Sequence, residues 1–467
     1  MPRSTTPDPA RTRVEGARAI LPGAVFNFAI ARVVTCGVVL ASSEVRDAGY
    51  WLDQGQALRA PPAALAWALP LLEGSQAWLP ALQVVCALAT GLALIGFLLR
   101  WALPASALSA LVLFAMPHFS GTPRHSMHLV WFLGVLALCP SGALLSFPQR
   151  IRAAHDERSA VTSTLGLNAL RLLLGCAYFF PGLWKLRESG LAWIASDNLQ
   201  NQMFWKWYQF GELPWLRIDG YPALVRWGAF GVVLFELCFP LLLWHRTSRW
   251  LAALAGVAFH RFAADFMFLP FSGLVACYVV LVDWARIWSW LQDLPGGGEE
   301  PSLIAAVRSL ASSRLRDGRV AVAALGSLSV VAGALVAGHR GAMQTYPFAC
   351  YPTFQWRAAA AMPDLWIAYL SHGVERFIRD SPAFGGVRSQ ARWGMAWRAA
   401  GLYGEVPEIT RLLGYYRSLP RTLLAPVPAT ATLRFYSVLV DVTPSAWQNP
   451  PLRRQLIGEW SPRALPP

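Results

Sequence analysis

Nine stretches of this chain are long and apolar enough to cross a lipid bilayer, and this feature constrains the fold most. A spanning helix needs about 20 predominantly apolar residues. Such stretches lie at 23–42, 77–99, 102–117, 127–147, 162–183, 223–244, 250–270, 273–291 and 320–338. Of the 467 residues, 55% are hydrophobic and 14% are charged, about half the charged share of a soluble domain. We therefore expect an all-α polytopic helix bundle of about nine spans in a lipid bilayer.

Basic residues occur in short clusters between these stretches, although the net charge is +14. They are not gathered into the single patch or arm that nucleic acid binding needs, so we exclude nucleic acid as a partner. Their bias toward alternate loops predicts a cytoplasmic tail at 1–22 and a transmembrane domain at 23–339. Nine spans then place an extracytoplasmic region at 340–467, and we expect a multi-pass protein of the cell inner membrane.

Residues beyond the last stretch have a different pattern. The alternating segments 364–370 and 433–441 predict strands, and 406–418 predicts a helix, so we expect a small C-terminal α+β region. Segment 184–222 is rich in Trp and Tyr and is expected to lie along the membrane surface. The weaker apolar stretch at 61–72 suits a re-entrant or interfacial piece.

Lys185 is the first candidate for chemistry. The chain has only two lysines, Lys185 and Lys206, among 40 basic residues. The pair Pro181–Gly182 predicts a helix break just before Lys185, and such a break can open a cavity. An amine against an apolar wall can act as a base, whereas an arginine stays charged. The alternative is a lysine that snorkels to the interface.

Four histidine and acidic positions are the next candidates. His125 and His128 share a helix face beside Arg124, either as a site or as a polar helix start. No HExxH motif accompanies them and none of the seven cysteines forms a CxxC pair, so we predict no metal site. His260 lies in an apolar stretch with Arg261 and Asp265, and the last two are spaced to pair; structural hydrogen bonding between helices is the alternative.

Glu236 lies in the middle of an apolar stretch, where a carboxylate needs a partner or a proton. We expect Arg171 or Arg261 to supply that partner, with a structural ion pair and a functional acid equally compatible. After the last stretch, the motif TYPFACYPTF at 345–354 holds two prolines that favour an extended chain. Its aromatic side chains are expected to cover the mouth of a cavity as a lid.

The segments around these residues resemble a known family. They are RHSMHL at 124–129, YFFPGLWKLRESGLAW at 178–193, LFELCFPLLL at 234–243 and AFHRFAADFMF at 258–268. Their order and spacing are similar to those of the horizontally transferred transmembrane (HTTM) domain family, the bacterial relatives of vitamin K-dependent gamma-carboxylase. The resemblance covers roughly residues 15–355.

The resemblance implies an activity and a set of residues. The lysine matching Lys185 deprotonates a hydroquinone, oxygen then yields a strong base, and carbon dioxide adds to a glutamate carbanion. The resemblance therefore implies a vitamin K-type reduced quinone with O2 and CO2 as cofactors. It also implies a lipid-soluble substrate and a peptide or protein partner. The catalytic residues would be Lys185, His125, His260 and Glu236; the substrate-binding residues would be Arg124, His128, Trp193, Arg261 and Asp265.

The chain also departs from the carboxylase. Only about 110 residues follow the TYPF motif, where the carboxylase has a large β-rich region, and its lysine doublet is Trp184–Lys185 here. Three functions therefore stay open. The first is a quinol-oxidising enzyme, an oxidoreductase or a carboxylating lyase, that uses Lys185 as base. The second is a membrane isoprenoid or terpenoid cyclase on the same scaffold. The third is a non-catalytic transporter or assembly partner.

Overall fold

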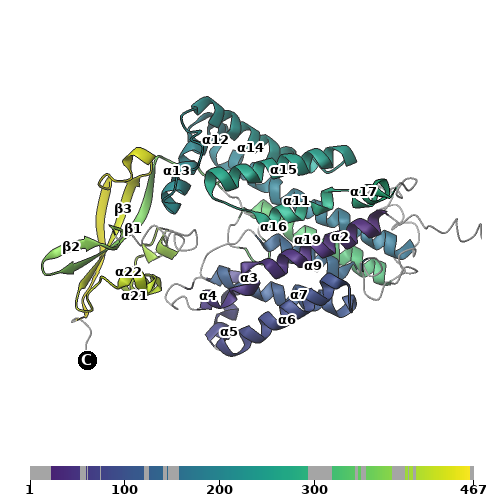
Figure 1. Cartoon of the computed structure of the whole chain (residues 1–467), viewed down its shortest axis with the longest axis horizontal. Helices are drawn as coiled ribbons and strands as arrows, with labels where there is room; N and C mark the ends of the chain where they lie inside the picture. Colours follow the sequence, from purple (N-terminus) through teal and green to yellow (C-terminus); the bar gives the residue numbers. More distant parts are fainter. Residues whose placement is uncertain are drawn as a thin grey trace, which may run out of the picture.

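The computed structural model describes 23–52, 59, 61–73, 75–119, 126–139, 145, 157–292, 318–341, 345–348, 354–380, 395–397, 399–402 and 406–462. The fold is a bundle of long apolar helices with a small antiparallel sheet beyond one of its ends (Figure 1). Arg124 and His125 lie outside the described residues, as does the expected tail at 1–22.

Six described helices are long and apolar enough to cross a membrane. They are α2 (Gly23–Ala41), α6 (Ser75–Ile95), α7 with α8 (Leu99–Leu113, Met116–Phe119), α11 (Glu157–Ser189), α14 (Pro222–Leu242) and α19 (Gly318–Arg340). A helical pair bent by 67°, Ser272–Leu281 followed by Trp284–Leu291, would make a seventh crossing. It comprises α16 (Ser272–Ala276), η3 (Cys277–Leu281) and α17 (Trp284–Leu291).

The expected count of nine spans is not confirmed. Helix α9 (Met127–Leu138) is apolar but has only 12 residues. Helix α15 (Arg246–Met267) has 22 residues, yet its three arginines and Asp265 reduce its apolar character. The stretch 61–72 forms the short helices η2 (Ala63–Ala68) and α5 (Leu69–Glu73). Two further short helices, α3 (Ser43–Arg46) and α4 (Ala48–Leu52), follow α2.

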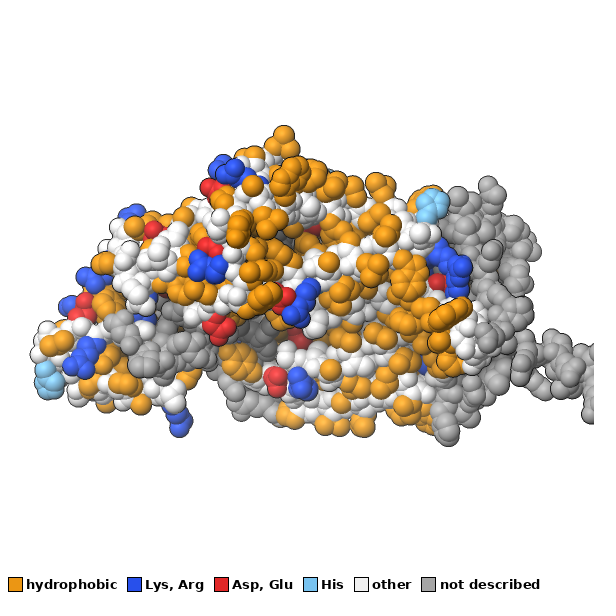
Figure 2. Space-filling model, turned by 45° about the horizontal axis from the view of Figure 1, so that its top comes forward, with side chains coloured by type: hydrophobic (Ala, Val, Ile, Leu, Met, Phe, Trp, Pro, Cys, Tyr) orange, Lys and Arg blue, Asp and Glu red, His pale blue; other side chains and the backbone are white. Residues whose placement is uncertain are grey.

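Helix α11 is the centre of the bundle. About 72% of its most apolar window is buried, and it packs against α2, α9, α14 and α19. Figure 2 shows many apolar side chains on the surface of the bundle. A group of basic side chains lies at the end of the bundle away from the sheet. Exposed apolar residues such as Leu88, Leu254 and Leu328 suit contact with lipid, the solvent in which such a surface is stable.

The C-terminal region forms a four-stranded antiparallel sheet in the order β2-β1-β3-β4. The strands are β1 (Ala361–Ser371), β2 (Val374–Phe377), β3 (Thr432–Asp441) and β4 (Arg453–Trp460). One face packs against α21 (Ile409–Ser418) and α22 (Arg421–Leu424). Short turns η5 (Ile378–Asp380) and η7 (Pro444–Ala446) flank the strands. The expected strands and helix are confirmed. In the strands, the alternating apolar residues face a buried core.

The other face of the sheet packs on α13 (Asn198–Phe210), which follows the short α12 (Ala192–Ala195). For α13 the expectation that 184–222 lies along the membrane surface stays a prediction, and the structure shows that its apolar side chains pack on protein. Trp207 and Met203 are fully buried between the sheet and the bundle, although Trp215 in the following loop is 80% exposed. An amphipathic helix presents the same sequence pattern to a lipid surface and to a protein surface, so the pattern alone does not distinguish them.

Candidate functional site

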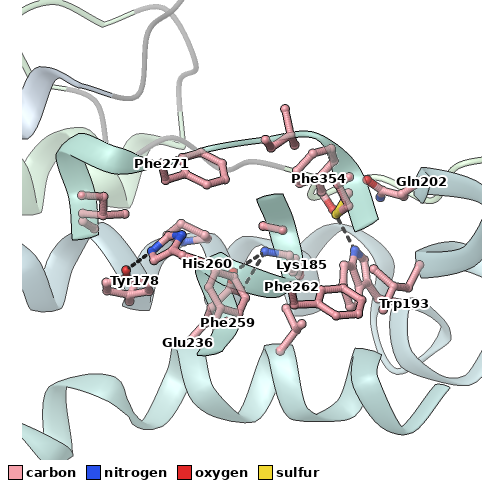
Figure 3. A pocket seen from close by; sticks show the side chains of 18 of the residues that line it. Tyr178, Lys185, Trp193, Gln202, Glu236, Phe259, His260, Phe262, Phe271 and Phe354 are labelled. Atoms are coloured by element: carbon pink, nitrogen blue, oxygen red, sulfur yellow. Dashed lines mark hydrogen bonds and ion pairs between the residues drawn. The ribbon is translucent and has the colours of Figure 1, made fainter. Parts of the chain in front are cut away.

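A cavity lies at the sheet-proximal end of the bundle, between α11, α14, α15, α13 and the chain that leads into β1 (Figure 3). Its volume is about 110 Å³, which is enough for several water molecules or a small molecule. Aromatic side chains form much of its wall: Tyr178, Trp193, Phe259, Phe262, Phe271 and Phe354. Its polar groups are His128, Lys185, Gln202, Glu236 and His260. The cavity therefore combines apolar walls with a few convergent polar groups.

Lys185 and Glu236 form a buried ion pair in this cavity. Lys185 Nζ donates to both carboxylate oxygens of Glu236, at 2.7 and 2.8 Å. The side chains are only 4% and 6% exposed. Lys185 Nζ also lies 5.4 Å from the centre of the Trp193 ring. Lys185 is thus neither a snorkelling residue nor an isolated amine.

Glu236 does not pair with either arginine that the sequence suggested. Arg171 donates to the carbonyl of Val280 at 2.9 Å. Arg261 bonds Asp265 at 2.7 Å, as its spacing predicted, and its side chain is 75% exposed. Arg261 and Asp265 are not among the residues that line the cavity. Lys185 and Arg171 both lie on α11, and which of them meets Glu236 depends on how α11 packs against α14, which the sequence does not reveal.

The helix break expected at Pro181–Gly182 does not occur. Helix α11 runs without interruption from Glu157 to Ser189, with Pro181 inside it. A proline inside a helix costs one backbone hydrogen bond, and tight packing against neighbouring helices can offset that cost. The cavity next to Pro181 therefore forms between helices and not at a helix break.

Gly182 allows the close approach of α11 and α14 beside the ion pair. A Cβ atom at this position would lie 2.8 Å from Glu236 Cβ and 3.3 Å from the Leu237 amide nitrogen. Ordinary carbon contacts are about 3.5–4.0 Å, so no larger residue fits without a shift. Gly182 thus places Glu236 within reach of Lys185, one helical turn further along α11.

His260, on α15, enters the cavity wall next to Tyr178 (Figure 3). Its Nε2 atom lies 2.5 Å from the Tyr178 hydroxyl, which also hydrogen-bonds the Tyr278 hydroxyl. His260 Nδ1 is buried and has no hydrogen-bond partner in the described part of the chain. The two tyrosines were not singled out from the sequence, although Tyr178 lies seven residues before Lys185 and so shares its helix face.

The chain from 354 to 359, which we call the strap, crosses from the cavity to strand β1. Six hydrogen bonds from side chains of α11–α13 hold its backbone, and their donors or acceptors are Ser189, Trp193, Asn198, Asn201, Gln202 and Trp205. Trp193 donates to the Phe354 carbonyl at 2.7 Å. Phe354 adopts a left-handed φ of 59°, which bulky residues rarely do, and its ring lines the cavity.

The lid expected over 345–354 is therefore supported at Phe354, while 349–353 lie outside the described residues. The earlier part of the motif packs elsewhere: Trp131 donates to the Pro347 carbonyl at 2.7 Å.

Lys206, the second lysine, lies next to the start of the strap. It is 8% exposed, donates to Gln209 Oε1 at 2.8 Å and sits 5.7 Å from the Phe354 ring centre. Burial lowers the pKa of Lys206 to about 8 because the charged form loses its hydration. Both lysines of the chain thus lie close to Phe354 or to the cavity that it lines.

The structure brings together five of the residues that the sequence suggested: Lys185, Glu236, His260, His128 and Trp193. In the described residues, no group of three or more His, Cys, Asp or Glu could hold a metal ion. Comparisons with protein-family models, with curated proteins and with solved structures find no match. The functional assignment therefore rests on the geometry of the cavity.

Proposed function

We propose that the chain is a membrane enzyme that acts on a lipid-soluble, quinol-type substrate bound in this cavity. The observation that carries the proposal is one aromatic-walled cavity that holds the Lys185–Glu236 pair and His260 together. A flat aromatic ring with polar oxygens fits such walls, because rings pack on rings while the oxygens need hydrogen-bond partners. The HTTM-like segments support the same chemistry, since they contain Lys185, Glu236 and His260.

In the proposed reaction Lys185 Nζ accepts the proton of a substrate hydroxyl. The amine must be neutral at that moment, and Glu236 makes this possible by holding the proton that the pair shares. Burying two charges in an apolar cavity is costly, so the neutral amine and neutral carboxyl compete with the charged pair. The resemblance implies the later steps: O2 would oxidise the resulting oxyanion to a stronger base. That base would take a proton from the γ-carbon of a glutamate in a peptide or protein partner, and CO2 would add to the carbanion.

The same proposal includes an orientation. The cavity lies at the sheet end of the bundle. The distribution of basic residues, taken with nine spans, would put that end outside the cytoplasm of an inner-membrane protein. A quinol dissolved in the bilayer would then meet the lysine near the outer leaflet.

A single Lys185→Met change is a poor test because it leaves Glu236 buried without a partner. Such a change costs about 3–5 kcal/mol of stability. The double variant Lys185→Met/Glu236→Gln removes both charges. We expect it to be more stable than the single variant, as shown by its thermal unfolding midpoint in detergent, and to lose at least about 100-fold of turnover.

Turnover is measured in proteoliposomes with a naphthohydroquinone, oxygen and bicarbonate, by oxygen uptake and by mass spectrometry of products. The control is Arg226→Gln, which breaks an exposed pair with Asp197; neither residue lines the cavity. Full turnover in a folded double variant would end the proposal.

A second candidate is an isoprenoid cyclase. Aromatic faces stabilise carbocations, and Phe259, Phe262 and Phe271 line the same cavity as the Glu236 carboxyl, which could supply the initiating proton. Product formation from an isoprenoid under strictly anaerobic conditions would favour this candidate over quinol oxidation.

A further inference from the structure

A buried chain of three hydrogen-bonding side chains lies behind the cavity wall. It joins His260 Nε2 to the Tyr178 hydroxyl and the Tyr178 hydroxyl to the Tyr278 hydroxyl. The three side chains are 3–5% exposed, so bulk water offers them no alternative partners. Gly256 makes room for the Tyr278 side chain, since a Cβ atom at position 256 would lie 2.2 Å from the Tyr278 hydroxyl oxygen.

Counting protons along this chain fixes the direction of its hydrogen bonds. Each tyrosine hydroxyl has one proton to donate, and a buried donor left without an acceptor is unfavourable. In the described part of the chain, Tyr178 is the only hydrogen-bond partner of the Tyr278 hydroxyl. Tyr278 therefore donates to Tyr178. Tyr178 has then accepted one bond, and its own proton goes to His260 Nε2.

The charge of His260 follows from the same count. If His260 were an imidazolium, both ring nitrogens would be donors, the direction of the chain would reverse, and the Tyr278 proton would have no acceptor. A buried imidazolium also needs a counter-ion, and the carboxylate that lines the cavity, Glu236, already binds Lys185 at 2.7 Å. His260 is therefore neutral, accepts at Nε2 and carries its proton on Nδ1.

We infer that His260 is held as the Nδ1–H tautomer and offers this N–H to the ligand of the cavity, which must present an acceptor oxygen there. Nδ1 is the polar ring atom of His260 that no described residue satisfies. The ligand class is a ring or chain with a carbonyl or an oxyanion at the His260 wall; a hydrocarbon leaves this donor unpaired. The inference rests on the proposed function only in using the same cavity.

Tyr178 and Tyr278 are positioning residues in this scheme, since they act through the imidazole. The tautomer is tested by solid-state ¹⁵N NMR of proteoliposomes labelled at the eight histidines, with the His260→Gln spectrum subtracted to isolate one ring. We expect a protonated Nδ1 and an unprotonated Nε2. In Tyr178→Phe, which leaves Nε2 without its donor, the ring should shift toward the Nε2–H tautomer. An Nε2–H signal for His260 in the unmodified protein would overturn the inference.

The ligand class is tested with two probes of similar shape, menadione, which has two carbonyl oxygens, and methylnaphthalene, which has none. We expect menadione to bind the unmodified protein about tenfold more tightly, as one added hydrogen bond allows. This preference should fall in His260→Phe and in Gly256→Ala, which displaces the Tyr278 hydroxyl. The matched control is Gly231→Ala, where a Cβ atom meets nothing within 4 Å. Equal affinity of the two probes in the unmodified protein would overturn the inference.

These readouts separate the inference from the proposed function. Both measure protonation and binding, so a protein without quinol turnover can still show the Nδ1–H tautomer and the preference for menadione. Conversely, quinol turnover that depends on Lys185 while His260 carries its proton on Nε2 would leave the proposed function standing and reject the inference.

Discussion

The two lysines of this chain are both buried, and they differ in how their charges are compensated. Lys185 is bonded to both oxygens of Glu236, whereas Lys206 has the neutral oxygen of Gln209 and the face of Phe354. An ion pair holds its charge in an apolar site far better than an amide and a ring do. The charge of Lys206, which has no carboxylate partner among the described residues, should therefore make stability depend on pH.

Stability should rise with pH between about 8 and 10.5 because of Lys206. Its pKa is about 8 in the folded protein and near 10.5 in an unfolded chain, so the unfolded state binds more protons in that window. Below pH 8 both states are protonated, and burial of the charge lowers stability by roughly 3 kcal/mol. The penalty disappears as pH rises through the window.

The measurement is the thermal unfolding midpoint in detergent from pH 7 to 10.5, for the unmodified protein and for Lys206→Met. Other groups titrate in this range, so the difference between the two proteins is the relevant quantity. It should shrink toward high pH, with the variant more stable at pH 7. A difference that stays constant with pH would contradict the prediction.

At the scale of helices, the approach of α11 to α14 depends on Gly182. We expect Gly182→Ala to separate the helices, to lengthen the Lys185–Glu236 contact and to cost about 1–3 kcal/mol, the usual range for overpacking. Gly231→Ala on α14 is the control, because its Cβ would meet no atom within 4 Å. The two variants are compared by their thermal unfolding midpoints. Equal midpoints would contradict the prediction, because they would show that α14 can move away from α11 at no cost in stability.

The helices and strands are the part of the structure that the sequence predicted well. Long apolar runs and the alternation in 364–370 and 433–441 are local patterns, and they match α11, β1 and β3. The pairing of Lys185 with Glu236 depends on which helices are neighbours, 51 positions apart in the sequence, and local patterns do not encode that. For the same reason the contacts of the strap could not be predicted, since its backbone is bound by side chains more than 150 positions away in the sequence.

Pro181 shows a second limit. The sequence rule that proline ends a helix holds for helices whose freed backbone groups meet water. Inside a bundle, neighbouring helices can compensate, and α11 continues to Ser189. The candidate residues were thus found by chemical type and unusual location, while the shape of the cavity was not.

For the whole molecule, the proposed orientation predicts which surfaces meet the periplasm. In a background without the seven native cysteines, a cysteine at Arg453 on strand β4 should react with a membrane-impermeant maleimide added to intact cells. A cysteine at Thr247, in the first turn of α15 at the opposite end, should react only after the membrane is opened. The reverse pattern would place the sheet in the cytoplasm.

The strap gives the sheet a role that its size does not suggest. Its residues are continuous with β1, and Phe354 at its start is part of the cavity wall. A truncation that removed the C-terminal sheet would also loosen the cavity wall at Phe354, even though no strand residue lines that cavity. A shortened version of this chain should therefore keep everything from Phe354 onward as a single piece.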